Sequence, residues 1–245
     1  MIDEQDKATE LKLGGDPDKA LRGEIQLDMK AILKEAWQHS RQGSLAMTVT
    51  FLALGLGWYG LDVLLAGLAP ALGLPQEHLG LALFSQLLIL GLTAPLITGL
   101  HMLGIFRSVG IPPSFRQALA WYPLASRLSL AALLSSVLVQ LGLSLFLLPG
   151  LFLLVAFCFT LPLVADKGLS PLAALRLGLH LAVRYGWQIL LVQLLGGLAL
   201  MAGVLSFGLL FVWAVPWYFN LHGVLYRELF GVRLAIRGRQ GVLAA

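Results

Sequence analysis

Charged residues are scarce in this 245-residue chain: Asp, Glu, Lys and Arg together make up 12% of it, whereas 58% of its residues are hydrophobic. A soluble domain typically contains about 25% charged residues, which help to cover its surface. One soluble core in a chain of this length could not hide so large an apolar excess. The composition therefore excludes an ordinary soluble fold and indicates an integral membrane protein.

Cysteine is nearly absent as well. Cys158 is the only one and lies within an apolar run, so neither a disulfide framework nor a cysteine metal site can form within the chain. The histidines are scattered and form no ligand set, so we expect no metal and no cofactor. No cleavable signal peptide is expected either, because the N-terminal segment is acidic and polar where a basic start and an apolar run would be needed.

Long uncharged segments begin at Ser44. A helix needs about 20 apolar residues to cross the hydrocarbon core of a bilayer. Spans are therefore predicted at 44–69, 79–106, 128–148 and 151–165, and two more by dividing 188–228 near Ser206. The sequence thus predicts an all-α integral membrane protein with six transmembrane helices.

Lysine and arginine are distributed unevenly between these spans. Seven precede the first span, three lie between spans two and three, three between spans four and five, and four follow span six; the other connections contain none. Basic residues are enriched in cytoplasmic loops, so both termini are predicted to face the cytoplasm. The basic excess, a formal net charge of +4, is then a topology signal and requires no nucleic acid partner.

The chain is predicted to have three parts. Residues 1–23 are polar and contain Gly14-Gly15-Asp16-Pro17, so we expect a flexible cytosolic tail without packed structure. Residues 24–230 form the membrane domain, and 231–245 form a basic cytosolic tail.

A unit of interfacial helix followed by a membrane hairpin is predicted three times. Apolar residues at helical spacing precede spans one, three and five, and the last of these helices begins with Ser170 as N-cap and Pro171. The second helix of each hairpin contains a proline expected to kink it: Pro95, Pro162 and Pro216. Either the hairpins are related by a pseudo-threefold arrangement, or short membrane segments simply resemble one another.

Glycines within the spans have two readings. Gly55, Gly57 and Gly60 match the GxGxxG pattern of dinucleotide-binding proteins, but that pattern has meaning only between a strand and a helix. These glycines lie inside span one, so the sequence favours close packing of helices through small residues. Glycines of span five are interpreted in the same way: Gly196, Gly197 and Gly203.

Three ionisable residues are candidates for a ligand or proton site. Asp62 lies inside an apolar segment, where a charge is costly, so it is either functional or an interfacial carboxylate paired with a neighbour. His101 and His222 follow Pro95 and Pro216 by the same six residues. The two histidines therefore either share a cavity on the cytoplasmic side or are satisfied separately at the interface.

A basic face is predicted on the helix before span five. Arg176, His180 and Arg184 recur at four-residue steps. They are candidates to contact anionic lipid headgroups, which attract basic side chains near a charged surface. The alternative is that they only determine topology.

Two segments carry a family resemblance. The stretch from Pro149 to Arg176, with Asp166-Lys-Gly-Leu-Ser-Pro171 within it, precedes Tyr185-Gly-Trp187, and Leu225-Tyr-Arg-Glu-Leu229 follows later. This pattern resembles the YciC-like uncharacterised inner-membrane families of bacteria and the related membrane domain attached to some glycerophosphodiester phosphodiesterases. The resemblance covers roughly residues 28–230. It implies a six-helix inner-membrane protein but no established reaction, and no phosphodiesterase catalytic domain is recognisable.

Without a catalytic set, the sequence favours a non-enzymatic membrane protein that acts through lipids or a partner protein, for example in envelope maintenance or complex assembly. The expected partners are membrane lipids, including anionic ones, and another membrane protein or a second copy of the chain. A small transporter or channel using the proline-broken helices and Asp62 is the alternative. A membrane-embedded enzyme would need Asp, His or Ser groups clustered at one depth.

Overall fold

The computed structural model describes residues 9–42, 45–71, 79–236 and 242–244, and most of them are helical. The helices are α1 (Pro17–Arg22), α2 (Met29–Arg41), α3 (Leu45–Ala71), α4 (Leu79–Ser108), α5 (Phe115–Leu119), the 3-10 helix η1 (Tyr122–Leu124), α6 (Ala125–Leu145), α7 (Leu147–Phe157), α8 (Thr160–Lys167), α9 (Pro171–Leu205) and α10 (Phe211–Phe230). Three short strands, β1 (Thr9–Leu13), β2 (Val232–Ile236) and β3 (Val242–Ala244), form one antiparallel sheet in this order.

Five helical segments of the described chain are long and apolar enough to cross a membrane, as expected of a multi-pass membrane protein: Leu45–Leu68, Leu83–Ser108, Phe115–Leu145, Leu147–Lys167 and Pro171–Leu205. The predicted helical membrane class is therefore confirmed at this level. α10, which the sequence predicts as a sixth span, is not among the five.

α10 is the central helix of the molecule. It packs against α2, α3, α4 and α9, and 13 of its 20 residues are buried. A helix enclosed by other helices can carry polar side chains that pair within the protein, whereas a lipid-facing helix cannot. This position explains why α10 can contain Asn220 and His222, which are both buried.

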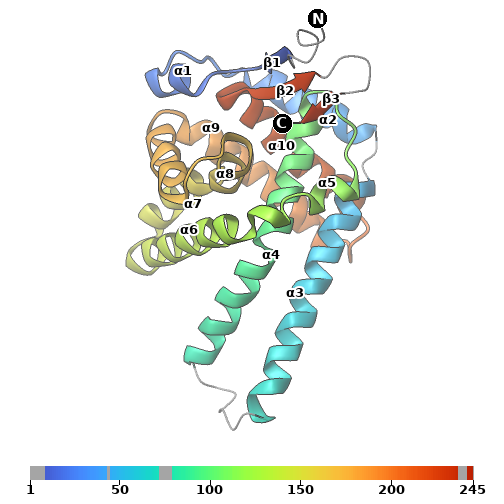
Figure 1. Ribbon diagram of the computed structural model, residues 1–245, viewed down its shortest axis with the longest axis vertical. Helices are drawn as coiled ribbons and strands as arrows, with labels where there is room; N and C mark the ends of the chain where they lie inside the picture. The colour runs from blue at the N-terminus through green and yellow to red at the C-terminus, as the bar shows by residue number, and fades with distance from the viewer. Residues whose placement is uncertain (1–8, 43–44, 72–78, 237–241, 245) are drawn as a thin grey trace, which may run out of the picture.

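The apolar helices do not form one parallel bundle. α3 and α4 run side by side along the long axis of the molecule, and one end of this pair extends beyond the other helices (Figure 1). α6 runs across that axis, and the small sheet lies at the opposite end of the molecule from the free end of the α3–α4 pair.

The expectation of an unstructured segment before residue 24 is wrong for the described residues of that segment. β1 pairs with β2, so that Leu13 lies opposite Val232, and α1 is capped by Asp16 at its N-terminus. The amide of Gly15 donates a hydrogen bond of 2.9 Å to the carbonyl oxygen of Arg227. The ends of the chain therefore order each other through contacts that no local pattern reveals. The sheet also adds strands to the predicted all-α fold.

The helices before the spans differ from one another. α2 packs on α10 through Ile32, Ala36 and Ser40, which are buried. Ser170 caps α9 as predicted, but α9 continues for 35 residues, so the predicted interfacial helix and span five are a single helix. Gly186 alone does not end the helix, because one glycine costs only about 1 kcal/mol relative to alanine.

The three prolines have different effects. α4 and α10 continue through Pro95 and Pro216, whereas the fourth apolar segment is interrupted between α7 and α8. The interruption lies at residues 158–159, and a proline at position 162 clashes with the carbonyl four residues earlier, that of Cys158.

Close helix packing occurs at other glycines than those expected in span one. A Cβ atom on Gly55, Gly57 or Gly60 would meet nothing within 4 Å, so the prediction that they pack helices is wrong. The close approach lies between α4 and α10, where a Cβ on Gly223 would come within 2.2 Å of the backbone of Gly104.

The span-five glycines behave differently from one another. A Cβ on Gly196 would lie 2.6 Å from the ring of Tyr218, and one on Gly203 would lie 2.3 Å from the ring of Phe211, so both accept an aromatic side chain of α10. Gly197, by contrast, faces open space. Only two of the three therefore act as predicted.

Candidate functional site

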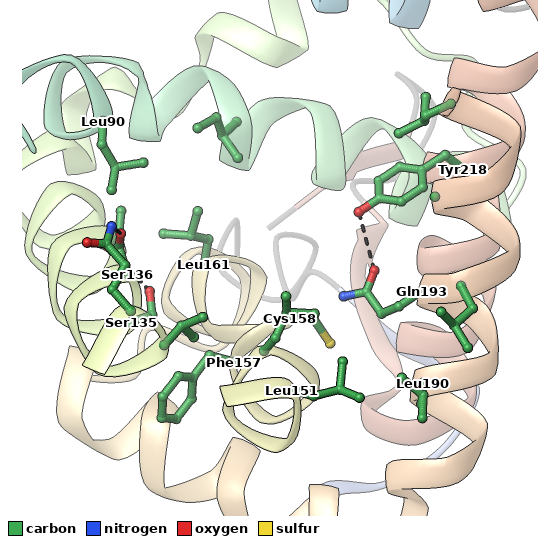
Figure 2. A pocket seen from close by; sticks show the side chains of 18 residues that line it. Leu90, Ser135, Ser136, Leu151, Phe157, Cys158, Leu161, Leu190, Gln193 and Tyr218 are labelled. Carbon is green, nitrogen blue, oxygen red and sulfur yellow. Dashed lines mark hydrogen bonds between the residues drawn. The ribbon is translucent and has the colours of Figure 1, made fainter. Parts of the chain in front are cut away.

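A cavity of about 760 Å³ lies between α4, α6, α7, α8, α9 and α10 (Figure 2). Its volume is in the range of roughly 300–1,000 Å³ that is usual for small-molecule sites. Most of its lining side chains are aliphatic or aromatic, among them Leu90, Leu151, Phe157 and Leu190. None of the described lining residues is Asp, Glu, Lys, Arg or His.

Polar side chains line the cavity in two groups. On one side Ser135, Ser136 and Gln140 project from α6; the hydroxyl of Ser135 donates to the carbonyl oxygen of Ala131, and the Gln140 amide donates to the Ser136 hydroxyl at 3.1 Å. The α6 group is thus largely satisfied within its own helix. The second group lies on the other side of the cavity (Figure 2).

The second group joins Gln193 of α9 to Tyr218 of α10. The Tyr218 hydroxyl lies 3.4 Å from Oε1 of Gln193. The same Oε1 lies 2.9 Å from Nε2 of His222, and Nδ1 of His222 lies 2.9 Å from the carbonyl oxygen of Tyr218. His222 is therefore connected to the cavity through Gln193 although it does not line it.

The structure brings the two predicted histidines together. The ring centroids of His101 and His222 are 5.7 Å apart in a T-shaped arrangement, and Phe219 packs edge-on against His101. Nδ1 of His101 is buried without a hydrogen-bond partner among the described residues. His222, one member of the pair, contacts the Gln193 amide. The two histidines, which follow Pro95 and Pro216 at equal spacing, thus meet where α4 contacts α10.

Asp62 is placed elsewhere. It is exposed on α3, and no described residue of α3 lines the cavity. The basic face is also separate: Arg176, His180 and Arg184 are exposed along one side of α9. His180 contacts the carbonyl oxygen of Arg176 through Nδ1, and Arg184 donates to the carbonyl oxygen of Arg22 at the end of α1.

An ion-pair cluster at the C-terminal end of α10 was not anticipated from the sequence. The guanidinium of Arg227 makes two hydrogen bonds to Glu35 of α2, at 2.6 and 2.8 Å, and others to Glu228 and to the carbonyl oxygen of Ser108. The hydrogen bonds from Arg227 hold the pKa of the Glu35 carboxyl below its usual range.

A second set of contacts joins the two segments that carry the family resemblance. The Tyr226 hydroxyl donates a hydrogen bond of 2.8 Å to Asp166, which also pairs with Lys167. Lys167 in turn donates to the carbonyl oxygen of Gly231 at 2.7 Å. The only sequence signal for these contacts was the presence of charged residues directly after apolar segments, and that signal does not identify partners.

The chemistry that the cavity offers is binding of an apolar molecule with an uncharged hydrogen-bonding group. In the described part of the chain, no group of three or more His, Cys, Asp or Glu side chains is placed to hold a metal ion. Comparison with known proteins gives no assignment: no family model matches the chain, and no curated protein and no solved structure matches it.

Proposed function

We propose that this chain is a non-enzymatic membrane protein that acts by holding a lipid chain in the cavity between α4, α6, α7, α8, α9 and α10. The observation that carries the proposal is the cavity itself, with about 760 Å³ of space and an apolar, uncharged lining. Acyl chains gain nothing from polar walls, and a lining of leucine, phenylalanine and glycine gives them close contact. Envelope maintenance or assembly of a membrane complex are the processes that such a protein would serve.

The proposed topology has six spans in three hairpins, with α10 as the sixth span and both termini in the cytoplasm of a bacterial cell, at its inner membrane. α10 has 20 residues, which at 1.5 Å per residue matches a hydrocarbon core of about 30 Å. The distribution of all 17 lysines and arginines supports this orientation. The resemblance to the YciC-like families supports the bacterial inner membrane.

Anionic headgroups are proposed to meet the protein outside the cavity. The exposed face of α9 formed by Arg176, His180 and Arg184 offers basic groups to the membrane surface. The uncharged cavity offers none. A partner membrane protein or a second copy of the chain would use exposed apolar surface of the same domain.

A small transporter is the second candidate, and one observation favours it. The break between α7 and α8 at residues 158–159 lies at the cavity wall, since Cys158 and Leu161 both line the cavity. Transporters commonly place interrupted helices at their substrate sites. Flux of a lipid analogue between the leaflets of a vesicle would distinguish transport from holding.

The test compares lipid retention by two glycine variants of the full chain. Gly197→Leu places a side chain into the cavity, whereas Gly55→Leu places the same side chain on the open face of α3. Both glycines lie within helices and neither has a neighbour within 4 Å of its Cβ position, so the variants are matched. Native mass spectrometry should show bound lipid on the parent and on Gly55→Leu, and little on Gly197→Leu. Equal retention by all three proteins would refute the proposal.

A further inference from the structure

We infer that the cavity selects an uncharged, single-chain amphiphile with a hydroxyl group, such as a long-chain alcohol, and that this hydroxyl donates a hydrogen bond to the side-chain carbonyl of Gln193. The inference rests on the proposed function, since it names the class of molecule whose chain the cavity holds. Three features of the site support it: the absence of charge in the described lining, the hydrogen bonds of His222, and the orientation that these bonds impose on Gln193.

The lining excludes a charged headgroup. A phosphate or carboxylate enclosed by the cavity would need a basic partner, because an unpaired charge loses its hydration without compensation. No described lining residue carries a charge of either sign. A polar head that lies within the cavity is therefore neutral, and a charged head would have to lie outside it.

The neighbours of His222 determine which of its ring nitrogens carries a hydrogen. Nδ1 lies 2.9 Å from the carbonyl oxygen of Tyr218, and a carbonyl only accepts hydrogen bonds, so Nδ1 carries a hydrogen. Nε2 faces the amide of Gln193. If both ring nitrogens donated to acceptors, the ring would be an imidazolium cation, yet none of the ion pairs among the described residues gives His222 a carboxylate partner. His222 is therefore the neutral tautomer, and Nε2 is an acceptor.

A neutral His222 determines which way the Gln193 amide points. The nitrogen and oxygen of an amide have nearly the same shape, so their assignment follows from the hydrogen-bond network. An acceptor at Nε2 requires the NH2 group of Gln193 to face His222, so the oxygen and nitrogen exchange the positions drawn in Figure 2, and the carbonyl oxygen takes the place of the nitrogen that points into the cavity. The Tyr218 hydroxyl, beside the same amide, is then free to donate to a ligand.

This pair of groups matches a hydroxyl better than other neutral heads. An alcohol can donate to Gln193 and accept from Tyr218 at once. A ketone or an ether only accepts, so it would leave the Gln193 carbonyl unpaired. Across the cavity, Ser135 donates to its own helix and the Gln140 amide donates to Ser136. The site is therefore selective for a donor.

Native mass spectrometry gives a direct assay, because each bound molecule adds its own mass to the chain. The full chain is purified without added ligand, and the bound fraction is measured at increasing ligand concentration. Hexadecanol, a methyl ketone of equal chain length and hexadecyl methyl ether are added in separate titrations. One extra hydrogen bond should let the alcohol half-saturate the chain at a concentration about tenfold lower than the ketone or ether.

Two variants separate this inference from the proposed function. In Gln193→Leu, all three compounds should still bind, but the preference for the alcohol should disappear. In Gly197→Leu, binding of all three should be lost. The parent protein alone can overturn the inference. If the ketone binds it as tightly as the alcohol does, the NH2 group of Gln193 faces the cavity and the inference is wrong. If Gly197→Leu leaves binding of all three compounds unchanged, the ligand chain does not occupy the cavity and the proposed function fails as well.

Discussion

The hydroxyl of Ser129 on α6 donates a hydrogen bond of 2.5 Å to the carbonyl oxygen of Gly91 on α4. Gly91 lies four residues before Pro95, which has no N–H, so this carbonyl has lost its partner within the helix. A carbonyl in hydrocarbon must find another donor. α6 supplies the donor that the proline removes, and the contact ties the second and third apolar segments together.

Replacing Ser129 should therefore destabilise the protein in a way that depends on Pro95. Ser129→Ala should lower the free energy of unfolding by about 1 kcal/mol, because the Gly91 carbonyl is left unpaired. In a Pro95→Ala background, the new N–H can reach Gly91, so the same change should cost less. Denaturant unfolding in mixed micelles measures both. Ser144→Ala is the control, since that exposed hydroxyl bonds only within its own helix; an equal loss in both backgrounds would contradict the explanation.

The contact between Gly104 and Gly223 should tolerate no side chain. A Cβ on Gly223 would lie 2.2 Å from the backbone of Gly104, so Gly223→Ala must push α4 and α10 apart. We expect a loss of about 1–3 kcal/mol in unfolding free energy. Gly55→Ala, on the open face of α3, should show no loss. Equal stability of the two variants would mean that the two helices do not approach each other at these glycines.

The ion pair between Glu35 and Arg227 should make stability depend on pH. Arg227 holds the pKa of Glu35 below its usual range, so the ionised carboxyl stabilises the fold at neutral pH. This contribution is present above the usual carboxyl pKa and is lost as pH falls through the lowered value in the folded protein.

Glu35→Gln should therefore lower the unfolding midpoint at neutral pH, and its difference from the parent should shrink as pH falls toward about pH 3. Glu24→Gln is a suitable control, because Glu24 pairs with Arg22 at an exposed position. A gap between Glu35→Gln and the parent that stays constant with pH would show that the carboxyl acts through packing alone.

Asp62 should be dispensable for lipid binding. It is exposed on α3, and no described residue of that helix lines the cavity. Asp62→Asn removes a charge whose placement in a bilayer is unfavourable, so lipid retention should be unchanged and stability equal or higher. Native mass spectrometry and thermal unfolding test this together. A clear loss of bound lipid would restore Asp62 as a ligand site.

Much of the candidate site was only partly visible in the sequence. The six-residue spacing of His101 and His222 from their prolines pointed to a shared location, and the rings do lie 5.7 Å apart. Gln193 carries no local signal in the sequence, because nothing in its neighbourhood shows that its amide lies between His222 and a cavity. The Glu35–Arg227 contact joins residues almost the whole chain apart, which no periodicity can reveal.

The sequence by itself determined that this chain has apolar helices of membrane-spanning length, because the composition of a segment decides whether it is more stable in water or in hydrocarbon. It also determined where α9 begins, because Ser170 caps the helix through a local hydrogen bond. Only the tertiary structure decided which side of each helix meets protein. In a membrane both the lipid and the protein interior are apolar, so hydrophobicity does not mark the packed face. The sequence therefore does not show that Gly223 packs closely and Gly55 does not. It also does not show that the residues lining the cavity enclose one.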